Sequence, residues 1–177
     1  EQRRIAKILN FGVIYGLSPH GVARQTDLTR QQGKEFIDLY FGKYPGIKNY
    51  INEVLEFAKK NKYVETITGR RRILPEINSP NFQLRSSSER MAINMPIQGS
   101  AADVIKIAMI NIDNEINKLN LKAKMIIQVH DELIFETPEE EVNLVKSMLN
   151  SIMPSSLELK VPLNIAISQN KTWGGLK

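Results

Sequence analysis

Two cations and two aromatic residues recur at four-residue intervals near the start of the sequence, at Arg3, Lys7, Phe11 and Tyr15. Four residues turn an α-helix by about 400°, so successive members are displaced by only about 40° around the axis. All four side chains therefore lie on one stripe, with cations at one end and rings at the other. Arg and Lys bind phosphate oxygens, and a ring stacks on a base for about 1–3 kcal/mol. The spacing favours a nucleotide-binding surface; a solvated helix end with two partly buried rings is the alternative.

A second series with the same spacing, Arg90, Asn94 and Gln98, places hydrogen-bonding side chains on one helical face, with Arg85 about one turn before it. Polar faces of this kind are also typical of helices that only face water. Arg, Asn and Gln, however, suit the acceptor atoms that every base pair presents in the minor groove. The series therefore predicts contacts to duplex nucleic acid that test the shape of a base pair. Pro96 lies within it, so the position of Gln98 depends on how the helix passes the proline.

The third feature is the run Val129-His130-Asp131-Glu132, a tight turn between two apolar segments. Acidic residues are common in turns, because Asp favours turn geometry. Adjacent residues on a strand point to opposite faces, so we do not expect Asp131 and Glu132 to chelate one ion together. Mg²⁺ takes oxygen ligands, often one or two carboxylates together with substrate phosphates. Asp131 is a candidate ligand of this kind, but the sequence offers no convincing second carboxylate.

Hydrophobic periodicity and turn residues predict the elements that carry these features. Helices are expected over residues 2–16, from a capping box at Thr29, after Pro45, from Phe82 to a kink or break at Pro96, from about Gly99 to Leu119, and after a second capping box at 137–140. Strands are expected within 63–74, at 125–129 and 133–135, and at 157–168. Loop residues at 75–81 mark the predicted domain boundary. The first half is helical and the second adds an antiparallel sheet, which gives an α+β fold class.

The amino-acid composition excludes some kinds of site and protein but does not by itself assign a function. The chain has 177 residues, a net charge of +5 and a pI near 9.4, which permit a polyanionic partner but do not require one. The lack of cysteine excludes disulfides and thiolate metal sites, and two histidines are too few for a histidine-based zinc site. We see no apolar run of membrane-spanning length and no signal peptide. A soluble, intracellular protein that is not secreted is the expectation.

Together the three features resemble family A DNA polymerases, the bacterial DNA polymerase I group. Residues 3–16 look like that family's fingers-helix motif, 90–103 like its duplex-contacting helix, and 129–132 like its palm carboxylate motif. The resemblance covers essentially the whole chain, in order. It implies part of a right-hand polymerase: a helical fingers subdomain at 1–81, and at 82–177 the C-terminal part of the palm, with an antiparallel sheet and long helices.

The resemblance also implies roles for individual residues. Arg3 and Lys7 would bind the triphosphate of a deoxynucleotide, with Lys7 also a general acid toward departing pyrophosphate. Phe11 would pack on the sugar and base, and Tyr15 near the templating position. In this family a tyrosine at the position of Phe11 is associated with acceptance of dideoxynucleotides, so Phe11 is expected to discriminate against them.

The remaining roles concern DNA and metal. Arg85, Arg90, Asn94, Gln98 and His130 would contact primer–template DNA, with His130 near the primer terminus. Asp131 would ligate catalytic Mg²⁺, with Glu132 close by. The implied reaction is two-metal transfer of a nucleotide to a primer 3′-hydroxyl in DNA replication or repair.

The family's first palm motif, with the other catalytic aspartate, does not occur in these 177 residues, nor does a thumb. We therefore expect the chain by itself to be inactive and the rest of the polymerase, thumb and N-terminal palm, to be its partner. The expected location is the cytoplasm of a bacterium or a DNA-containing organelle.

Three alternatives stand beside this interpretation. A single-subunit, phage-type RNA polymerase shares a Lys, a Tyr-Gly and a His-Asp pair at comparable places, although Glu132 and Phe11-Gly12 favour a DNA polymerase. A non-catalytic DNA-binding module, or a subunit of a split polymerase, would use the same polar helix faces. A helical scaffold with chance matches is the third.

Overall fold

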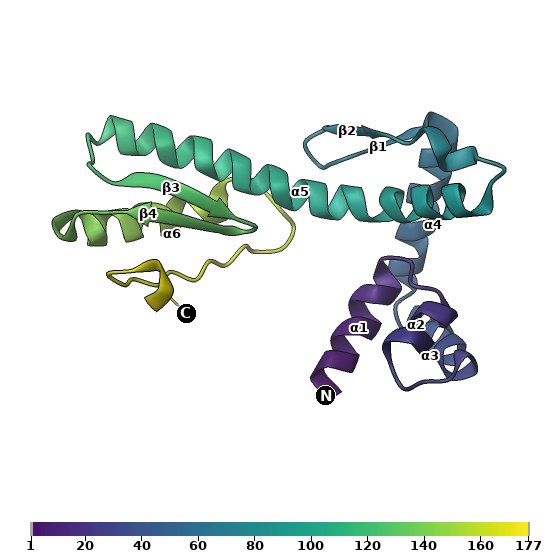
Figure 1. The fold of residues 1–177 in the computed structure, drawn as a ribbon. Coiled ribbons are helices and arrows are strands. Elements are labelled where there is room, and N and C mark those ends of the chain that lie inside the picture. The colour runs from purple at the N-terminus through teal and green to yellow at the C-terminus, as the bar shows by residue number, and fades with distance from the viewer. Residues whose placement is uncertain (1, 177) are drawn as a thin grey trace. The chain divides into compact units, whose positions relative to one another are not determined.

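The computed structural model describes residues 2–176 and the side chains of residues 3–176. The chain forms two compact units, residues 1–100 and 101–177, and the long helix α5, Phe82–Lys118, contributes to both (Figure 1). The first unit is mainly helical, and the second combines helices with an antiparallel hairpin. The predicted α+β class is therefore confirmed. The subdomain limits 1–81 and 82–177 stay a prediction.

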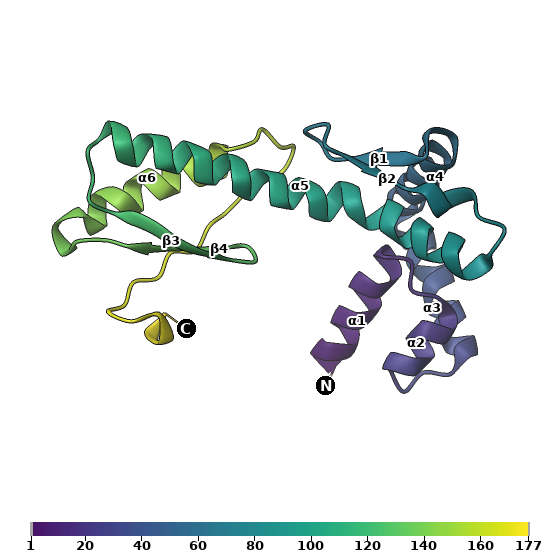
Figure 2. The same ribbon diagram turned by 45° about the horizontal axis from the view of Figure 1, so that its top comes forward.

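The first unit begins with three helices, α1 (Gln2–Ile14), α2 (Pro19–Gln25) and α3 (Arg30–Lys43), grouped together in Figure 2. Gly16, with a φ of +80°, lies in the turn after α1, where a residue without Cβ adopts the left-handed conformation freely. The predicted capping box before α3 is confirmed. The Gln32 backbone N–H donates to the Thr29 hydroxyl at 3.2 Å, and the Thr29 backbone N–H donates to the Gln32 side chain at 2.8 Å.

The same unit continues with α4 (Pro45–Asn61) and the antiparallel strands β1 (Tyr63–Glu65) and β2 (Arg71–Ile73). The turn between the strands contains Gly69, whose φ is +84°. A 3-10 helix, η1 (Pro75–Asn78), then leads to α5. The core beneath the hairpin consists of Ala58, Val64, Leu74, Ile77, Ala92 and Met95. Ile77 is fully buried, so the segment predicted as loop also contributes to packing.

Helix α5 runs through Pro96 without a break, so the two helices expected on either side are one helix of 37 residues. A proline inside a helix removes one backbone hydrogen bond and disfavours the helix by about 3 kcal/mol. Burial compensates here, because Ala92, Ile93 and Met95 lie in the core immediately before the proline. The Ser100 hydroxyl also donates a hydrogen bond to the Pro96 carbonyl. Tertiary packing thus overrides the local signal.

The second unit packs the C-terminal part of α5 against a hairpin and a helix. Strands β3 (Lys124–Val129) and β4 (Glu132–Glu136) are antiparallel, with a register shift between Met125 and Ile127, and α6 spans Val142–Ser155. Figures 1 and 2 both show α6 beside this hairpin. The core consists of Ala108, Ile112, Ile116, Ala123, Val145, Met148 and Leu149. The hairpin and α6 are confirmed as predicted.

The prediction of a second capping box at 137–140 is wrong. A 3-10 helix, η2 (Glu139–Glu141), precedes α6, and no side chain caps the first turn of α6. Glu141 instead accepts hydrogen bonds from the backbone N–H groups of Lys122, at 2.9 Å, and Ala123, at 3.0 Å. The acidic run therefore ties α6 to the segment before β3, a contact that sequence spacing does not reveal.

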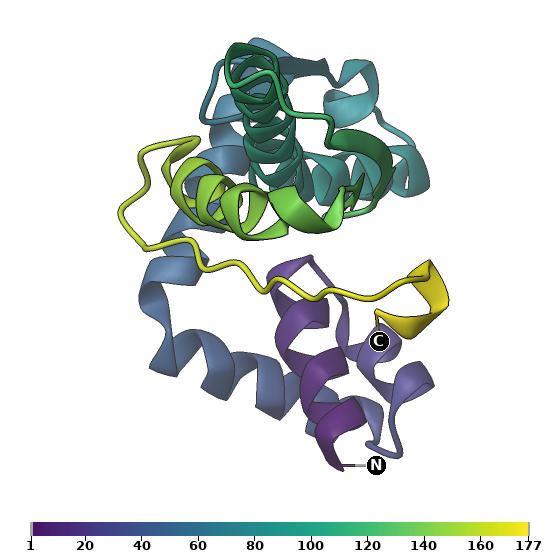
Figure 3. The same cartoon turned by 90° about the vertical axis from the view of Figure 1, so that its left-hand side faces the viewer.

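The prediction of a final strand at 157–168 is also wrong. Within the described chain these residues pair with no other strand. Residues 163–168 nevertheless alternate between half-buried and exposed, and Ile165 and Ile167 pack against the core of the second unit. The segment is the unwound stretch after α6 in Figure 3. The sequence carries the period of a strand, but a ladder also needs a neighbouring strand to supply hydrogen bonds.

Candidate functional site

The α1 stripe lies on the surface of the first unit. Arg3, Lys7 and Phe11 are exposed, with Phe11 at 52%, and Tyr15 is half-buried. The opposite face of the helix supplies the core residues Leu9 and Val13. The rings of Phe11 and Tyr15 are stacked, with centroids 6.5 Å apart and planes 18° from parallel. The stripe thus presents two cations and a pair of parallel rings on one side of a helix, as its spacing predicts.

Tyr50 of α4 is a neighbour of this stripe that the sequence interpretation did not single out. Its hydroxyl is buried and has no hydrogen-bond partner within the described protein. Burial raises the pKa of Tyr50 above its usual value, and the proximity of Tyr15 raises it further. From the sequence, Tyr50 reads as one of the regularly spaced apolar positions of α4. Only its buried hydroxyl and the proximity of Tyr15 distinguish it from them.

The end of α1 lies against α5 within the first unit. A Cβ built on Gly16 would lie 3.5 Å from Cγ of Arg90 and 3.7 Å from Cδ1 of Ile93. The ring end of the α1 stripe is therefore adjacent to the start of the polar series on α5. The two features that sequence spacing defined separately lie side by side in the same unit.

Because α5 is continuous, Arg90, Asn94 and Gln98 share one helical face. Arg90 and Gln98 are exposed, and the Arg90 guanidinium donates to the Ser86 hydroxyl at 2.8 Å. Asn94 is half-buried, and its side-chain oxygen is buried without a hydrogen-bond partner in the described protein. A buried acceptor of this kind is destabilising unless a donor reaches it.

Arg85 differs from the other members of the series. Its guanidinium donates to the Ser79 carbonyl at 2.8 Å and lies 5.8 Å from the centre of the Phe82 ring. These contacts hold the loop before α5. The structure therefore gives Arg85 a structural role, and its predicted contact with DNA stays a prediction.

In the second unit, His130 and Asp131 form a two-residue turn, since Val129 pairs with Glu132. His130 has a φ of +56°, whereas Asp131 is not among the residues with positive φ. This sign pattern matches a type II′ turn, whose first central position normally holds glycine. The Gln128 side chain donates to the His130 carbonyl at 3.0 Å and braces the turn. Asp131 and Glu132 are both exposed.

The turn supplies carboxylate oxygens suited to a hard cation, but not a complete site. Among residues 2–176, no group of three His, Asp or Glu side chains is arranged to hold a metal ion. Asp131 therefore fits the chemistry of a Mg²⁺ ligand as one member of a larger set.

The charges divide unevenly between the units. Residues 1–100 contain sixteen Lys and Arg and nine Asp and Glu, a net charge of +7. Residues 101–177 contain eight Lys and Arg and ten Asp and Glu, a net charge of −2. The positive excess of the chain thus lies in the unit that carries the α1 stripe and the polar face of α5, which suits a polyanion.

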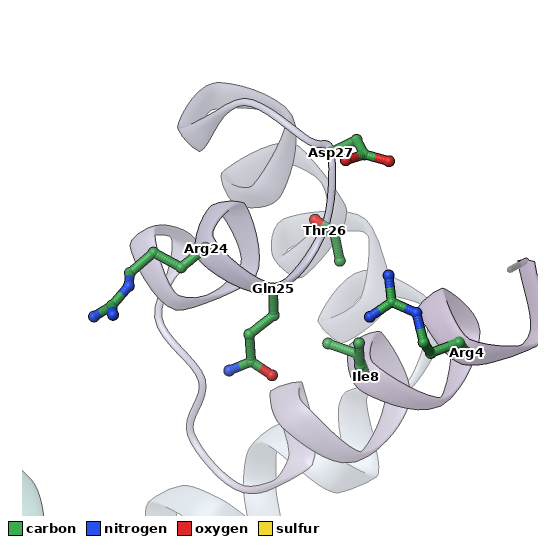
Figure 4. A pocket seen from close by; sticks show the side chains of 6 residues that line it. All are labelled: Arg4, Ile8, Arg24, Gln25, Thr26 and Asp27. Atoms are coloured by element: carbon green, nitrogen blue, oxygen red, sulfur yellow. The ribbon is translucent and has the colours of Figure 1, made fainter.

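A shallow cavity of about 380 Å³ lies between α1 and the end of α2, lined by Arg4, Ile8, Arg24, Gln25, Thr26 and Asp27. Figure 4 shows the charged ends of Arg4, Arg24 and Asp27 pointing in different directions. None of the predicted site residues lines it. The exposed faces of α1 and α5 in the first unit, and the Asp131 turn in the second unit, are therefore treated as separate candidate surfaces in place of this cavity.

No helix formed by residues 2–176 has the length and apolar character needed to cross a membrane.

The predicted site residues fall into two groups: Arg3 to Gln98 in the first unit, and His130, Asp131 and Glu132 in the second. That the two groups act together on one nucleotide and its Mg²⁺, as the resemblance implies, stays a prediction.

Comparison with known proteins gives concordant matches. The family description DNA polymerase family A matches residues 1–175. DNA polymerase I of Lactococcus lactis subsp. lactis (strain IL1403) is 47% identical over 173 residues, which cover 98% of this chain and 20% of that protein. DNA polymerase I of Geobacillus stearothermophilus is 44% identical over 173 residues, with the same coverages. The chain thus spans about one fifth of the length of these curated relatives.

A solved structure also matches: the POL domain of Pol1 from M. smegmatis, in complex with DNA primer-template and dNTP. The TM-score is 0.94 and the identity 40%, over 98% of this chain and 31% of that chain. The likeness confirms that the α+β fold is that of a partial polymerase domain.

Proposed function

Since the chain belongs to DNA polymerase family A, we propose that it carries the fingers and the C-terminal part of the palm of a DNA-directed DNA polymerase. The observation that carries the proposal is the meeting of the α1 stripe with the polar face of α5 at Gly16 and Arg90. This approach brings the end of α1 that follows the stacked rings next to Arg90, the first residue of the polar series, and supports the proposal that both features bind one nucleic-acid substrate. The complex of the M. smegmatis relative with primer-template and dNTP supports the same ligands for this chain.

The α1 stripe is the proposed nucleotide-binding surface. Arg3 and Lys7 bind the triphosphate of the incoming deoxynucleotide, since both cations are exposed at the end of the stripe away from the rings. Phe11 packs on the sugar and base, and Tyr15 lies near the templating base. Lys7 gives a proton to the departing pyrophosphate, because an ammonium next to the phosphates offers a positioned acid.

The polar face of α5 is the proposed contact with primer–template DNA. Arg90 and Gln98 are exposed and can reach minor-groove acceptors, which occur on every base pair. Asn94 is proposed to direct its amide nitrogen toward the duplex. This orientation requires a donor for its buried side-chain oxygen, which has none in the described protein. His130 is proposed to lie near the primer terminus, and Arg85 to contact the primer–template DNA.

Asp131 is proposed to hold Mg²⁺, with Glu132 beside it. Two such ions, when bound, would supply activation of the primer 3′-hydroxyl and stabilisation of the charge on the leaving pyrophosphate. Asp131 supplies one carboxylate from an exposed, braced turn, and the family's first palm motif supplies the other from outside these 177 residues. The 177-residue chain alone is therefore expected to extend no primer, and addition of the upstream palm segment is expected to restore extension.

The test uses the full-length enzyme that carries this chain. Lys7→Ala and Asp131→Asn are each expected to lower kcat for primer extension at least a hundredfold, because one removes a proton donor and phosphate ligand and the other a metal ligand. Lys34→Ala on α3 and Glu136→Gln at the far end of β4 are the matched controls, since both residues are exposed. Wild-type rates for Lys7→Ala and Asp131→Asn would refute the proposal.

Use of dNTPs over rNTPs by the same enzyme separates this function from that of a single-subunit RNA polymerase, and extension itself excludes a non-catalytic DNA-binding subunit. Action in DNA replication and repair, in the cytoplasm of a bacterium or in a DNA-containing organelle, is part of the same proposal, and the similarity to DNA polymerase I of two bacteria supports the bacterial location.

A further inference from the structure

The turn of the β1–β2 hairpin reaches α5 beside Gln98. The Arg70 guanidinium donates to the Gly99 carbonyl at 3.0 Å, and the Ile67 backbone N–H donates to the Ser100 hydroxyl at 3.0 Å. Figure 1 shows the hairpin alongside this part of α5. Two residues that directly follow Gln98 are thus bound to a hairpin about thirty positions earlier in the sequence.

The hairpin turn is closed by hydrogen bonds of its own. The Thr66 hydroxyl accepts from the Arg70 backbone N–H at 3.1 Å and lies 2.9 Å from the Thr68 hydroxyl. The Thr66 backbone N–H donates to the Arg70 carbonyl at 2.9 Å. Thr66 is also buried, at 4% exposure. The turn therefore presents Arg70 to α5 from a fixed frame.

The contact with α5 is close enough to require glycine. A Cβ on Gly99 would lie 2.7 Å from the Thr66 methyl and 3.3 Å from the Arg70 guanidinium. Because Thr66 is buried and hydrogen-bonded on its other side, it cannot move aside easily. An alanine at position 99 would push the hairpin and the helix apart.

The contact lies in the helical turn that follows Pro96. Pro96 has no backbone N–H, so the Ala92 carbonyl, four residues earlier, lacks its usual helical donor. The Ser100 hydroxyl donates to the Pro96 carbonyl and accepts from the hairpin, so it links the two. The hairpin therefore adds hydrogen bonds to the helical turn that follows the proline, at Gly99 and Ser100.

We propose that the turn of the β1–β2 hairpin, through Arg70, Thr66 and Gly99, is a positioning element that holds Gln98 in line with Arg90 and Asn94. Arg70 is a positioning residue: it acts through Gln98. The inference rests on the proposed function, in which this face of α5 contacts primer–template DNA.

The experiment uses the full-length polymerase and a fluorescent primer–template. Arg70→Gln, Gln98→Ala and the double variant are compared for the Kd of the duplex, for kcat at saturating duplex and for Tm. Arg71→Gln is the matched control, because the Arg71 guanidinium contacts Glu65, at 3.3 Å, and the Tyr63 ring within the hairpin. Gly99→Ala is a second, independent variant, with Gly42→Ala of α3 as its control, since a Cβ there meets nothing within 4 Å.

Arg70→Gln is expected to raise Kd about threefold to tenfold, the range for loss of the hydrogen bond to the Gly99 carbonyl, with kcat at saturating duplex within about twofold of wild type. The double variant is expected to bind no more weakly than Gln98→Ala, since both act on one contact. Gly99→Ala is expected to weaken binding in the same direction. Arg71→Gln and Gly42→Ala are expected to bind as wild type.

Any one of three results would overturn the inference: effects on Kd that multiply in the double variant, wild-type binding by Arg70→Gln, or an equal loss of binding in Arg71→Gln. A loss of duplex binding that is fully explained by a lower Tm would also overturn the inference. If Arg90→Ala and Gln98→Ala weaken binding but Arg70→Gln does not, only the positioning role fails. If neither Arg90→Ala nor Gln98→Ala weakens binding, the DNA-contacting role of α5 fails as well.

Discussion

Replacing Phe11 by tyrosine tests the nucleotide-binding stripe most directly. The Phe11 side chain is 52% exposed, and its ring stacks on Tyr15 with centroids 6.5 Å apart. The ring edge can therefore carry a hydroxyl without displacing core residues. We expect Phe11→Tyr to leave Tm unchanged and to alter only the choice between deoxy- and dideoxynucleotides.

The expected size follows from one hydrogen bond. A dideoxynucleotide lacks the 3′-hydroxyl, and the phenol at position 11 would replace the contact which that hydroxyl makes within the nucleotide. A hydrogen bond to a charged partner contributes about 1.5–3 kcal/mol. Because about 1.4 kcal/mol corresponds to a factor of ten, the ratio of dideoxy to deoxy incorporation is expected to rise about tenfold to a hundredfold.

The assay is primer extension by the full-length enzyme in mixtures of a dideoxy- and the matching deoxynucleotide, with termination quantified on a gel. Phe57→Tyr of α4 is the control, because Phe57 is also exposed, at 40%, and lies in the same unit. An unchanged ratio in Phe11→Tyr, or an equal rise in Phe57→Tyr, would show that Phe11 does not contact the nucleotide sugar.

Three further predictions concern single contacts. Thr29→Ala removes the capping box of α3 and is expected to destabilise that helix end by about 1 kcal/mol, seen as faster amide hydrogen exchange in its first turn; unchanged exchange would contradict it. The raised pKa of Tyr50 favours its neutral form, so its contribution to stability is present below pH 10 and lost as pH rises through the folded-state pKa. Tyr50→Phe should therefore retain more of its Tm above pH 10 than wild type does, and parallel Tm curves would refute this. Glu141→Ala removes the acceptor of two backbone N–H groups and is expected to destabilise the second unit by about 1–3 kcal/mol in urea unfolding, whereas Glu140→Ala, at an exposed neighbouring position, is expected to have little effect.

Short-range signals in the sequence determined much of the fold. The capping box at Thr29, the turn at Gly69 and the hairpin around Asp131 all depend on residues within a few positions of one another, so their spacing is sufficient. The α1 stripe is of the same kind, because the pitch of a helix fixes which side chains share a face. The family resemblance likewise rested on runs of neighbouring residues.

Long-range contacts decided the rest. Pro96 breaks a helix by local rules, yet the buried residues beside it and the hairpin at Gly99 keep α5 continuous. Residues 163–168 have the period of a strand, but no strand in the described chain pairs with them. The adjacency of Gly16 and Arg90, which joins the two candidate surfaces, spans more than seventy residues. Such contacts depend on which distant surfaces are buried together, and spacing along the sequence carries no record of that choice.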